Sequence, residues 1–324
     1  MLRGVKIVVL DAATLDFPPF AWEGLRALGE LVLYDLTPAD RAVTVSRCAD
    51  AAVVLTNKVP LDAETLAALP ELRLVGVLAT GHNIVAGAAA RARGVVVCNV
   101  PEYSTYSVVQ HTLALILAWA NQVAPHAAAV DAGEWVRSER FSFWKNAPRE
   151  LNGDTAGIIG FGNIGARVAD LLHGLGMKVL AYARHRQGAP AWQPFAWAGV
   201  EEIFEQADVV SLHCPQTPEN TRFVNAALLA RMKPTALLVN TARGGLIDEP
   251  ALAAALRAGR PAAAALDVLA REPMAPDCPL RGLPNCVITP HLAWASEKAR
   301  RRLLETTAAN LRAFLAGAPQ NVVN

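Results

Sequence analysis

The sequence predicts an α/β protein with two domains, each built on a doubly wound parallel sheet and one inserted within the other. Its 324 residues are too many for one ordinary hydrophobic core and fit two domains of typical size. Short, continuously apolar runs alternate with stretches of helical periodicity, a pattern typical of parallel strands that helices cover on both faces. Between one such run and the next helical stretch lies a glycine-rich motif, Gly160 to Gly165. We therefore expect a nucleotide-binding domain beside a smaller domain.

The apolar runs form two series along the chain. The N-terminal series predicts five strands, at 5–10, 31–34, 52–55, 74–78 and 95–98, with helices between them at 20–28, 61–69 and 84–92. The second series predicts six strands, at 157–159, 179–182, 209–213, 237–240, 264–268 and 287–289. Two long helical patterns, at 107–124 and 296–315, are expected to connect the domains. We therefore expect one domain from residues 1–100 and 292–324, and an inserted dinucleotide-binding domain from residues 101–291.

Composition and charge argue against several classes of protein. With 53% hydrophobic and 18% charged residues, the chain is typical of a globular protein. Its longest apolar stretch, 113–120, is far shorter than the roughly 18 residues that a membrane span needs, and residues 1–10 lack the apolar core of a secretory leader. A net charge of +1 offers no basic surface to nucleic acid, and the five cysteines are too far apart for a metal site. We expect a cytoplasmic protein with no membrane, nucleic-acid or metal partner.

The motif Gly160-Phe161-Gly162-Asn163-Ile164-Gly165 follows directly on a predicted strand and opens an amphipathic helix. In that context Gly160 permits a tight turn, Gly162 lets a pyrophosphate approach the backbone, and Gly165 lets helix and strand pack closely. We expect all six residues to bind a dinucleotide. The apolar face of the helix, expected to be buried, comprises Ile164, Val168, Leu171, Leu172 and Leu175. A tight turn without a ligand is the alternative.

The end of the following strand favours NADP(H), with NAD(H) as the alternative. NAD usually requires an Asp or Glu about 20 residues after the motif, to accept hydrogen bonds from the ribose 2′-hydroxyl. The sequence has Ala183 at that point, followed by Arg184 and Arg186, and a guanidinium fork matches a 2′-phosphate. Arg184 is therefore expected to bind the cofactor. If both arginines are solvated or stack on adenine, the preference stays open.

The later strands also end at the carboxyl edge, where open α/β sheets bind ligands. Expected cofactor contacts that follow these strands are His213, Cys214, Pro215, Thr217, Thr241 and Ala242. Three further strand ends supply Arg243, Glu272 and His291. Reduction of a 2-keto acid needs a cation for its carboxylate and a proton donor at the carbonyl oxygen. Arg243 can supply the first and His291 the second, while Glu272 would stabilise the imidazolium, so the three together predict a catalytic trio.

These motifs, in this order and spacing, resemble the D-isomer-specific 2-hydroxyacid dehydrogenases, most of all the glycerate dehydrogenase and hydroxypyruvate/glyoxylate reductase branch. The resemblance covers nearly the whole chain and is carried by 77–81, 98–101, 107–112, 160–165, 213–215, 240–245, 267–268, 272–273 and 290–291. It implies a Rossmann nucleotide-binding domain inserted in a smaller flavodoxin-like substrate domain. It also implies hydride transfer between a nicotinamide cofactor and a small 2-keto or D-2-hydroxy acid, glyoxylate or hydroxypyruvate first of all.

The resemblance implies further roles for individual residues. Asp267 would hold the nicotinamide amide, and a substrate site would include Ala79, Thr80, Gly81 and Trp294 as well as Arg243 and His291. Family members are typically homodimers, which would account for the aromatic segment at 131–152; a loop folded on its own domain is the alternative. Ile84 and Ala86 stand where relatives usually have Asn and Asp, so the reaction is predicted more firmly than the substrate. The competing hypotheses are a nucleotide-sensing, corepressor-like interaction protein and a phosphite or formate dehydrogenase.

Overall fold

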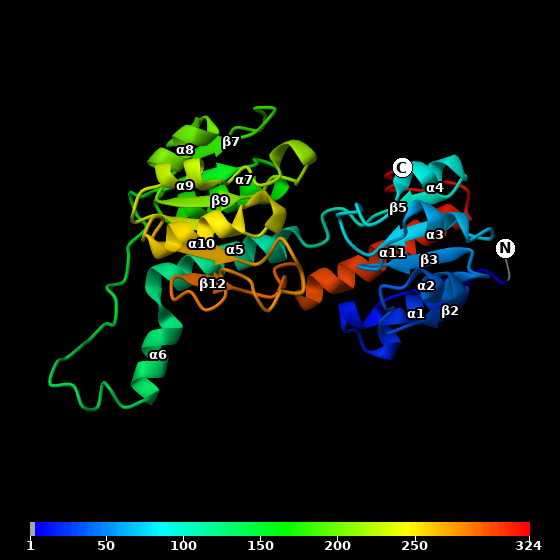
Figure 1. Ribbon diagram of the computed structural model, residues 1–324, viewed down its shortest axis with the longest axis horizontal. Helices are drawn as coiled ribbons and strands as arrows, with labels where there is room; N and C mark the ends of the chain where they lie inside the picture. Colours follow the sequence, from blue (N-terminus) through cyan, green and yellow to red (C-terminus); the bar gives the residue numbers. More distant parts are fainter. Residues whose placement is uncertain (1–3) are drawn as a thin grey trace. The chain divides into compact units, whose positions relative to one another are not determined.

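The computed structural model describes residues 4–324, which form two compact units (Figure 1). One unit comprises the described residues up to Ser104 together with Ala295–Asn324, and the other comprises Thr105–Trp294. Residues 1–3, which are part of the segment 1–10 that lacks the apolar core of a secretory leader, lie outside the described residues. The chain thus leaves the first unit once and returns to it once.

The first unit contains a five-stranded parallel sheet of order β2-β1-β3-β4-β5. Its strands are β1 (Lys6–Val9), β2 (Glu30–Leu33), β3 (Val53–Thr56), β4 (Leu74–Val77) and β5 (Val96–Cys98). Each boundary lies within one residue of the predicted one, because strands buried on both faces are written as continuous apolar runs. This strand order is the flavodoxin-like one, as expected.

Helices of the first unit occupy the predicted stretches, with two additions. The helices in those stretches are η2 (Pro19–Trp22), α1 (Glu23–Arg26), α3 (Ala63–Ala67), α4 (Gly87–Ala92) and α11 (Glu297–Leu315). The short helix η1 (Ala12–Leu15) was not predicted. Helix α2 (Arg41–Cys48) was not predicted, because it buries little more than Thr44 and Cys48. Its beginning is marked by Asp40, whose carboxylate accepts a hydrogen bond from the Val43 amide at 3.1 Å.

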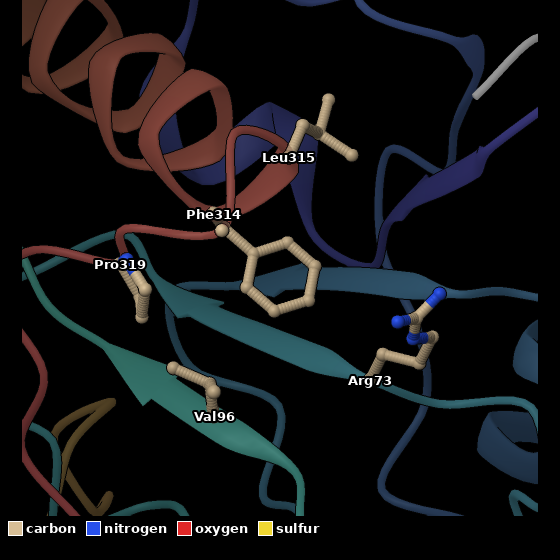
Figure 2. Close-up of a pocket in the computed structure, with 6 residues that line it drawn as sticks. Arg73, Val96, Phe314, Leu315 and Pro319 are labelled. Atoms are coloured by element: carbon tan, nitrogen blue, oxygen red, sulfur yellow. The ribbon is translucent and has the colours of Figure 1, made fainter. Parts of the chain in front are cut away.

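A surface pocket of about 350 Å³ lies in the first unit, where the end of α11 meets the sheet (Figure 2). Phe314 lies between Val96 and Arg73 in this pocket, and Leu315, Gly317 and Pro319 complete the lining. Arg73 precedes β4 and Val96 begins β5, so the pocket is at the amino edge of the sheet. Open α/β sheets bind ligands at the opposite edge, so this pocket is not the expected ligand site.

The second unit contains a seven-stranded parallel sheet of order β12-β11-β10-β9-β6-β7-β8. Its strands are β6 (Thr155–Ile159), β7 (Lys178–Tyr182), β8 (Phe195–Trp197), β9 (Val209–Leu212), β10 (Leu237–Asn240), β11 (Ala263–Leu266) and β12 (Cys286–Ile288). The prediction of six strands was wrong, because β8 pairs with β7 at one edge. This strand has three residues that are only partly buried or exposed, so no continuous apolar run marks it.

The strand order reverses between β6 and β9, which places the ligand site of such a sheet at their carboxyl ends. Helices α8 (Val200–Gln206), α9 (Ala226–Arg231) and α10 (Glu249–Arg257) bury one face, through side chains such as Phe204, Leu229 and Leu252. Helices α5 (Thr105–Asn121) and α7 (Asn163–Gly174) bury the other, through Ile116 and Leu172.

Helix α7 turns a different face to the sheet from the one predicted. It buries Val168, Ala169 and Leu172, whereas Leu171 and Leu175 are 42% and 39% exposed. The expectation that these two leucines lie on the buried face was therefore wrong. The spacing from Gly165 to Val168 and Leu172 already completes the stripe that contacts the sheet, and Leu171 and Leu175 fall beside it.

Helix α6 (Val123–Asp131) and the loop after it extend away from the sheet of the second unit (Figure 1). The predicted helix at 107–124 ends instead at Asn121, because Gln122 adopts a φ of 47°. In the loop, Trp135, Phe141 and Trp144 are 50%, 94% and 61% exposed, and the Trp135 indole donates to the Phe141 carbonyl at 3.1 Å. Among residues 4–324, no single helix has the length and apolarity of a membrane span; α5 and α6, bent by 55°, meet that test only as a pair.

Candidate active site

The glycine-rich loop after β6 has the shape that the sequence predicts. Gly160 has a φ of 100°, and a Cβ atom there would collide with the backbone of His213 and Cys214. A Cβ atom on Gly165 would collide with the Gly160 carbonyl, whereas one on Gly162 would meet nothing within 4 Å. The first and third glycines are therefore required by packing. The second glycine, Gly162, borders open space.

That open space adjoins the N-terminus of α7, and together they fit a dinucleotide pyrophosphate. Gly162 is the N-cap residue of α7, and no side chain caps the helix there. The amides of a helix N-terminus and the helix dipole attract anions. Phe161, inside the loop, is held by aromatic contacts with Phe195 and Trp197 at centroid distances of 5.3 and 5.2 Å. Strand β8 thus anchors the loop, a role that the sequence analysis missed.

The end of β7 lies beside this loop, since the Gly160 amide donates to the Tyr182 carbonyl at 2.8 Å. Ala183 follows, and Arg184 and Arg186 are both exposed. The Thr217 hydroxyl and, to a smaller extent, the charge of Arg184 hold the pKa of the Glu219 carboxyl below its usual value. Arg184 is therefore within electrostatic reach of η3 (Pro218–Asn220), the turn that follows β9.

The segment after β9 brings neutral polar groups to the carboxyl ends of β6 and β9, where the strand order reverses. His213 Nε2 lies 2.9 Å from Ser211 Oγ, and burial lowers the pKa of His213 to about 4, so its imidazole is neutral at pH 7. Burial raises the pKa of the Cys214 thiol, which argues against a nucleophilic role. Beyond Pro215, the Thr217 amide donates to Asn220 Oδ1 at 2.7 Å and shapes the turn.

The turn after β10 presents Arg243 at the carboxyl edge. Fully buried Asn240 shapes this turn, because its side chain accepts from the Ala242 amide at 3.0 Å and donates to the Arg243 carbonyl at 2.9 Å. Thr241 Oγ1 lies 2.9 Å from Thr112 Oγ1 of α5. Arg243 itself is exposed and donates to the Ala242 carbonyl at 2.7 Å. Within residues 4–324 it forms no ion pair, so its guanidinium is available for a carboxylate.

His291 and Glu272 are brought together as predicted. His291 Nδ1 lies 2.6 Å from Glu272 Oε2, and the two side chains are 28% and 34% exposed. The other Glu272 oxygen accepts from the Leu269 amide at 2.9 Å, which fixes the carboxylate. An ionised carboxylate only accepts, so Nδ1 carries the proton of this hydrogen bond and Nε2 is the atom left to exchange a proton.

Arg243, Glu272 and His291 follow β10, β11 and β12, which are consecutive in the sheet. The carboxyl ends of parallel neighbours meet at one edge, so the three residues share that edge. The backbone of Gly244 packs directly on Leu269 and Ala270, just before Glu272.

Asp267 is 1% exposed, and its carboxylate is occupied by the turn that carries His291. It accepts from the Thr289 hydroxyl at 2.6 Å and from the amides of Leu292 and Ala293 at 3.0 and 2.9 Å. The His291 amide donates to the Asp267 carbonyl at 2.8 Å. Asp267 therefore supports the histidine, and its contact with nicotinamide stays a prediction.

The remaining predicted substrate residues are divided between the units. Ala79, Thr80 and Gly81 follow β4 in the first unit, whereas partly buried Trp294 ends the second. The Thr80 hydroxyl donates to the Val100 carbonyl at 2.9 Å, and Asn99 Nδ2 donates to the Thr80 carbonyl at 2.7 Å. The backbone of the 79–81 loop is thereby fixed.

Comparisons with known proteins identify the family of this chain. The model of the D-isomer specific 2-hydroxyacid dehydrogenase, NAD binding domain, matches residues 113–293. A hydroxypyruvate reductase from Blautia hydrogenotrophica is 42% identical and covers 99% of this chain and 100% of its own. A glycerate dehydrogenase from Methylorubrum extorquens is 41% identical, with 98% of each chain covered.

Among solved structures, an NADPH-dependent glyoxylate/hydroxypyruvate reductase from Sinorhizobium meliloti, in complex with NADP and malonate, superposes with a TM-score of 0.84. It is 28% identical and covers 98% of this chain and 96% of its own. The glycine loop, the two α/β units and these matches lead to one assignment. The chain belongs to the D-isomer-specific 2-hydroxyacid dehydrogenase family and is an oxidoreductase that uses a nicotinamide cofactor on a small 2-hydroxy or 2-keto acid.

Proposed function

We propose that this enzyme reduces glyoxylate or hydroxypyruvate with NADPH, the second unit binding the cofactor and the first unit contributing to the substrate site. The observation that carries the reaction is the hydrogen-bonded pair of His291 and Glu272 at the same sheet edge as Arg243, which forms no ion pair with the described part of the chain. The names of the relatives, hydroxypyruvate reductase, glycerate dehydrogenase and glyoxylate/hydroxypyruvate reductase, support the choice of substrate. They do not favour a corepressor or a phosphite or formate dehydrogenase.

The roles of the trio follow from charge. A nicotinamide held by the second unit would supply a hydride for the carbonyl carbon. Arg243 would bind the substrate carboxylate through its fork and polarise the carbonyl, and His291 Nε2 would donate the proton that the carbonyl oxygen takes up. Glu272 holds His291 Nδ1 at 2.6 Å and offsets the positive charge of the imidazolium before the transfer.

The substrate carboxylate would also be bound by backbone amides of the 79–81 loop, with Trp294 beside the rest of the substrate. The fixed backbone of that loop supports this proposal, because preorganised amides lose little entropy on binding an anion.

The direct test is to follow NADPH and NADH oxidation with glyoxylate, hydroxypyruvate, pyruvate and 2-ketoglutarate. We expect turnover of the first two with kcat/KM at least about tenfold above the others, and D-glycerate as the product from hydroxypyruvate. Turnover confined to another 2-keto acid would change the assigned substrate but leave the assigned reaction unchanged. Failure with all four would contradict the proposed activity.

The preference for NADPH is proposed from Ala183 and Arg184. An acid at the end of β7 would repel a 2′-phosphate, whereas the Arg184 fork can bind it. Arg184→Ala should raise the Kd for NADPH by about tenfold and that for NADH by less than about twofold. Glu219→Gln removes a carboxylate whose pKa the charge of Arg184 helps to lower, and it should lower the Kd for NADPH. Fluorescence titration checks both, and an Arg184→Ala variant with unchanged NADPH affinity would remove the basis of this preference.

We also propose that two copies associate through α6 and the loop after it. The exposed rings of Trp135, Phe141 and Trp144 lie in one segment, and burying them in a second copy would remove their apolar surface from water. Phe141→Asp combined with Trp144→Asp should convert a dimer to a monomer in light scattering. Leu36→Asp, at an equally exposed leucine of the first unit, is the control and should leave the mass unchanged. A wild-type monomer at all concentrations would exclude the dimer.

A further inference from the structure

We propose that Ser107 and His111, both on α5, are positioning residues that hold the turn carrying His291 in its catalytic shape. We call residues 289–293 the histidine turn. This inference rests on the proposed function, in which His291 is the proton donor. It adds two residues of α5 to the machinery of the reaction.

The histidine turn has a backbone that needs support. His291 has a φ of 50°, in the left-handed region that residues other than glycine seldom adopt. Such a conformation persists only where the surroundings over-determine it, and it is typical of functional sites. The direction of the imidazole depends on this backbone angle. Contacts that fix the backbone of the histidine turn therefore also fix the direction of His291 Nε2.

Contacts from α5 bracket His291 on both sides along the chain. The Ser107 hydroxyl donates to the Ala293 carbonyl at 2.6 Å, two residues after the histidine. His111 Nε2 lies 3.1 Å from Thr289 Oγ1, two residues before it. Asp267, directly after β11, accepts hydrogen bonds from the same turn. The histidine turn is therefore held both by α5 and by the end of β11. Ser107 and His111 are one helical turn apart, which places them on one face of α5.

The direction of the His111 hydrogen bond follows from proton counting. The single hydroxyl proton of Thr289 is donated to Asp267 Oδ1 at 2.6 Å. Thr289 Oγ1 can then only accept from His111, so His111 Nε2 carries a proton and donates it. The same nitrogen lies 3.5 Å from Asp267 Oδ1. A leucine at position 111 would leave Thr289 without this donor, whereas the amide of a glutamine could replace it.

Helix α5 does not depend on these two side chains for its place in the fold. Its buried residues include Val108, Val109, Leu115 and Ile116, which pack with the core of the second unit. The His111 side chain is 18% exposed, and Ser107 is likewise only partly buried. Their replacement should therefore loosen the histidine turn more than it destabilises the domain.

Four variants of the full-length protein test this inference. We expect His111→Leu to lower kcat by about tenfold or more and Ser107→Ala by about fivefold, with KM and the Kd for NADPH within about twofold of wild type. His111→Gln, which keeps the N–H donor, should recover most of the lost kcat. Gln110→Ala, at an exposed position of the same helical turn, is the matched control and should behave as wild type.

Hydrogen exchange in the cofactor-free protein provides a readout that does not need activity. Amides of residues 289–293 should exchange about tenfold faster in His111→Leu and at the wild-type rate in Gln110→Ala. Unchanged exchange and kcat in His111→Leu would overturn the inference, as would a loss of kcat that His111→Gln does not restore. If His291→Asn keeps full activity while exchange responds as expected, the proposed role of His291 fails and the support of the turn stands.

Discussion

His291→Asn is expected to lower kcat by about 10³-fold, with the Kd for the nicotinamide cofactor within about threefold of wild type. General acid catalysis by a positioned side chain contributes on this scale, and His291 is the one member of the trio whose Nε2 can donate to a carbonyl oxygen. Asparagine is the informative replacement because it tolerates the left-handed backbone of this position, where φ is 50°. The loss then reports the missing imidazole and not a disturbed turn.

Glu272→Gln removes the charge of the pair and one of its two acceptor oxygens. Glutamine can still accept from His291 Nδ1, but its NH2 group then faces the Leu269 amide, and it no longer offsets the imidazolium charge. We expect kcat to fall by about 10- to 100-fold, less than for His291→Asn. Steady-state rates and cofactor titrations of both variants decide the matter. If His291→Asn loses less than about tenfold in kcat, or if the loss is mainly in cofactor affinity, His291 is not the proton donor.

The strands of both sheets could be predicted because a buried strand is visible in the sequence as a short run of consecutive apolar residues. A strand covered on both faces must be continuously apolar, and such runs located all five strands of the first unit and six of the second. Strand β8 was not predicted because it lies at the edge of its sheet, where burial on both faces is not required. Helix α2 escaped because it buries only a narrow stripe.

The candidate site could be predicted as a set of strand ends but not as a network. Glu272 and His291 were linked by the chemistry that their pairing allows, and the structure places them 2.6 Å apart. His111 and Thr289 are separated by 178 residues, and neither carries a pattern that points to the other. Such contacts depend on how α5 packs against the ends of β11 and β12, which local periodicity does not encode.

Arg243→Ala should raise KM for the 2-keto acid by about 100-fold and lower kcat by about 10-fold or more, because Arg243 would bind both the ground state and the developing charge of the transition state. Arg243→Lys keeps a cation without the fork and should recover only part of either loss. Arg271→Ala removes another exposed arginine, next to Glu272, and serves as the matched control for a general change of charge at this edge. Equal effects in Arg271→Ala and Arg243→Ala would reduce the role of Arg243 to long-range attraction. A KM effect specific to Arg243 would instead locate the substrate carboxylate at the end of β10.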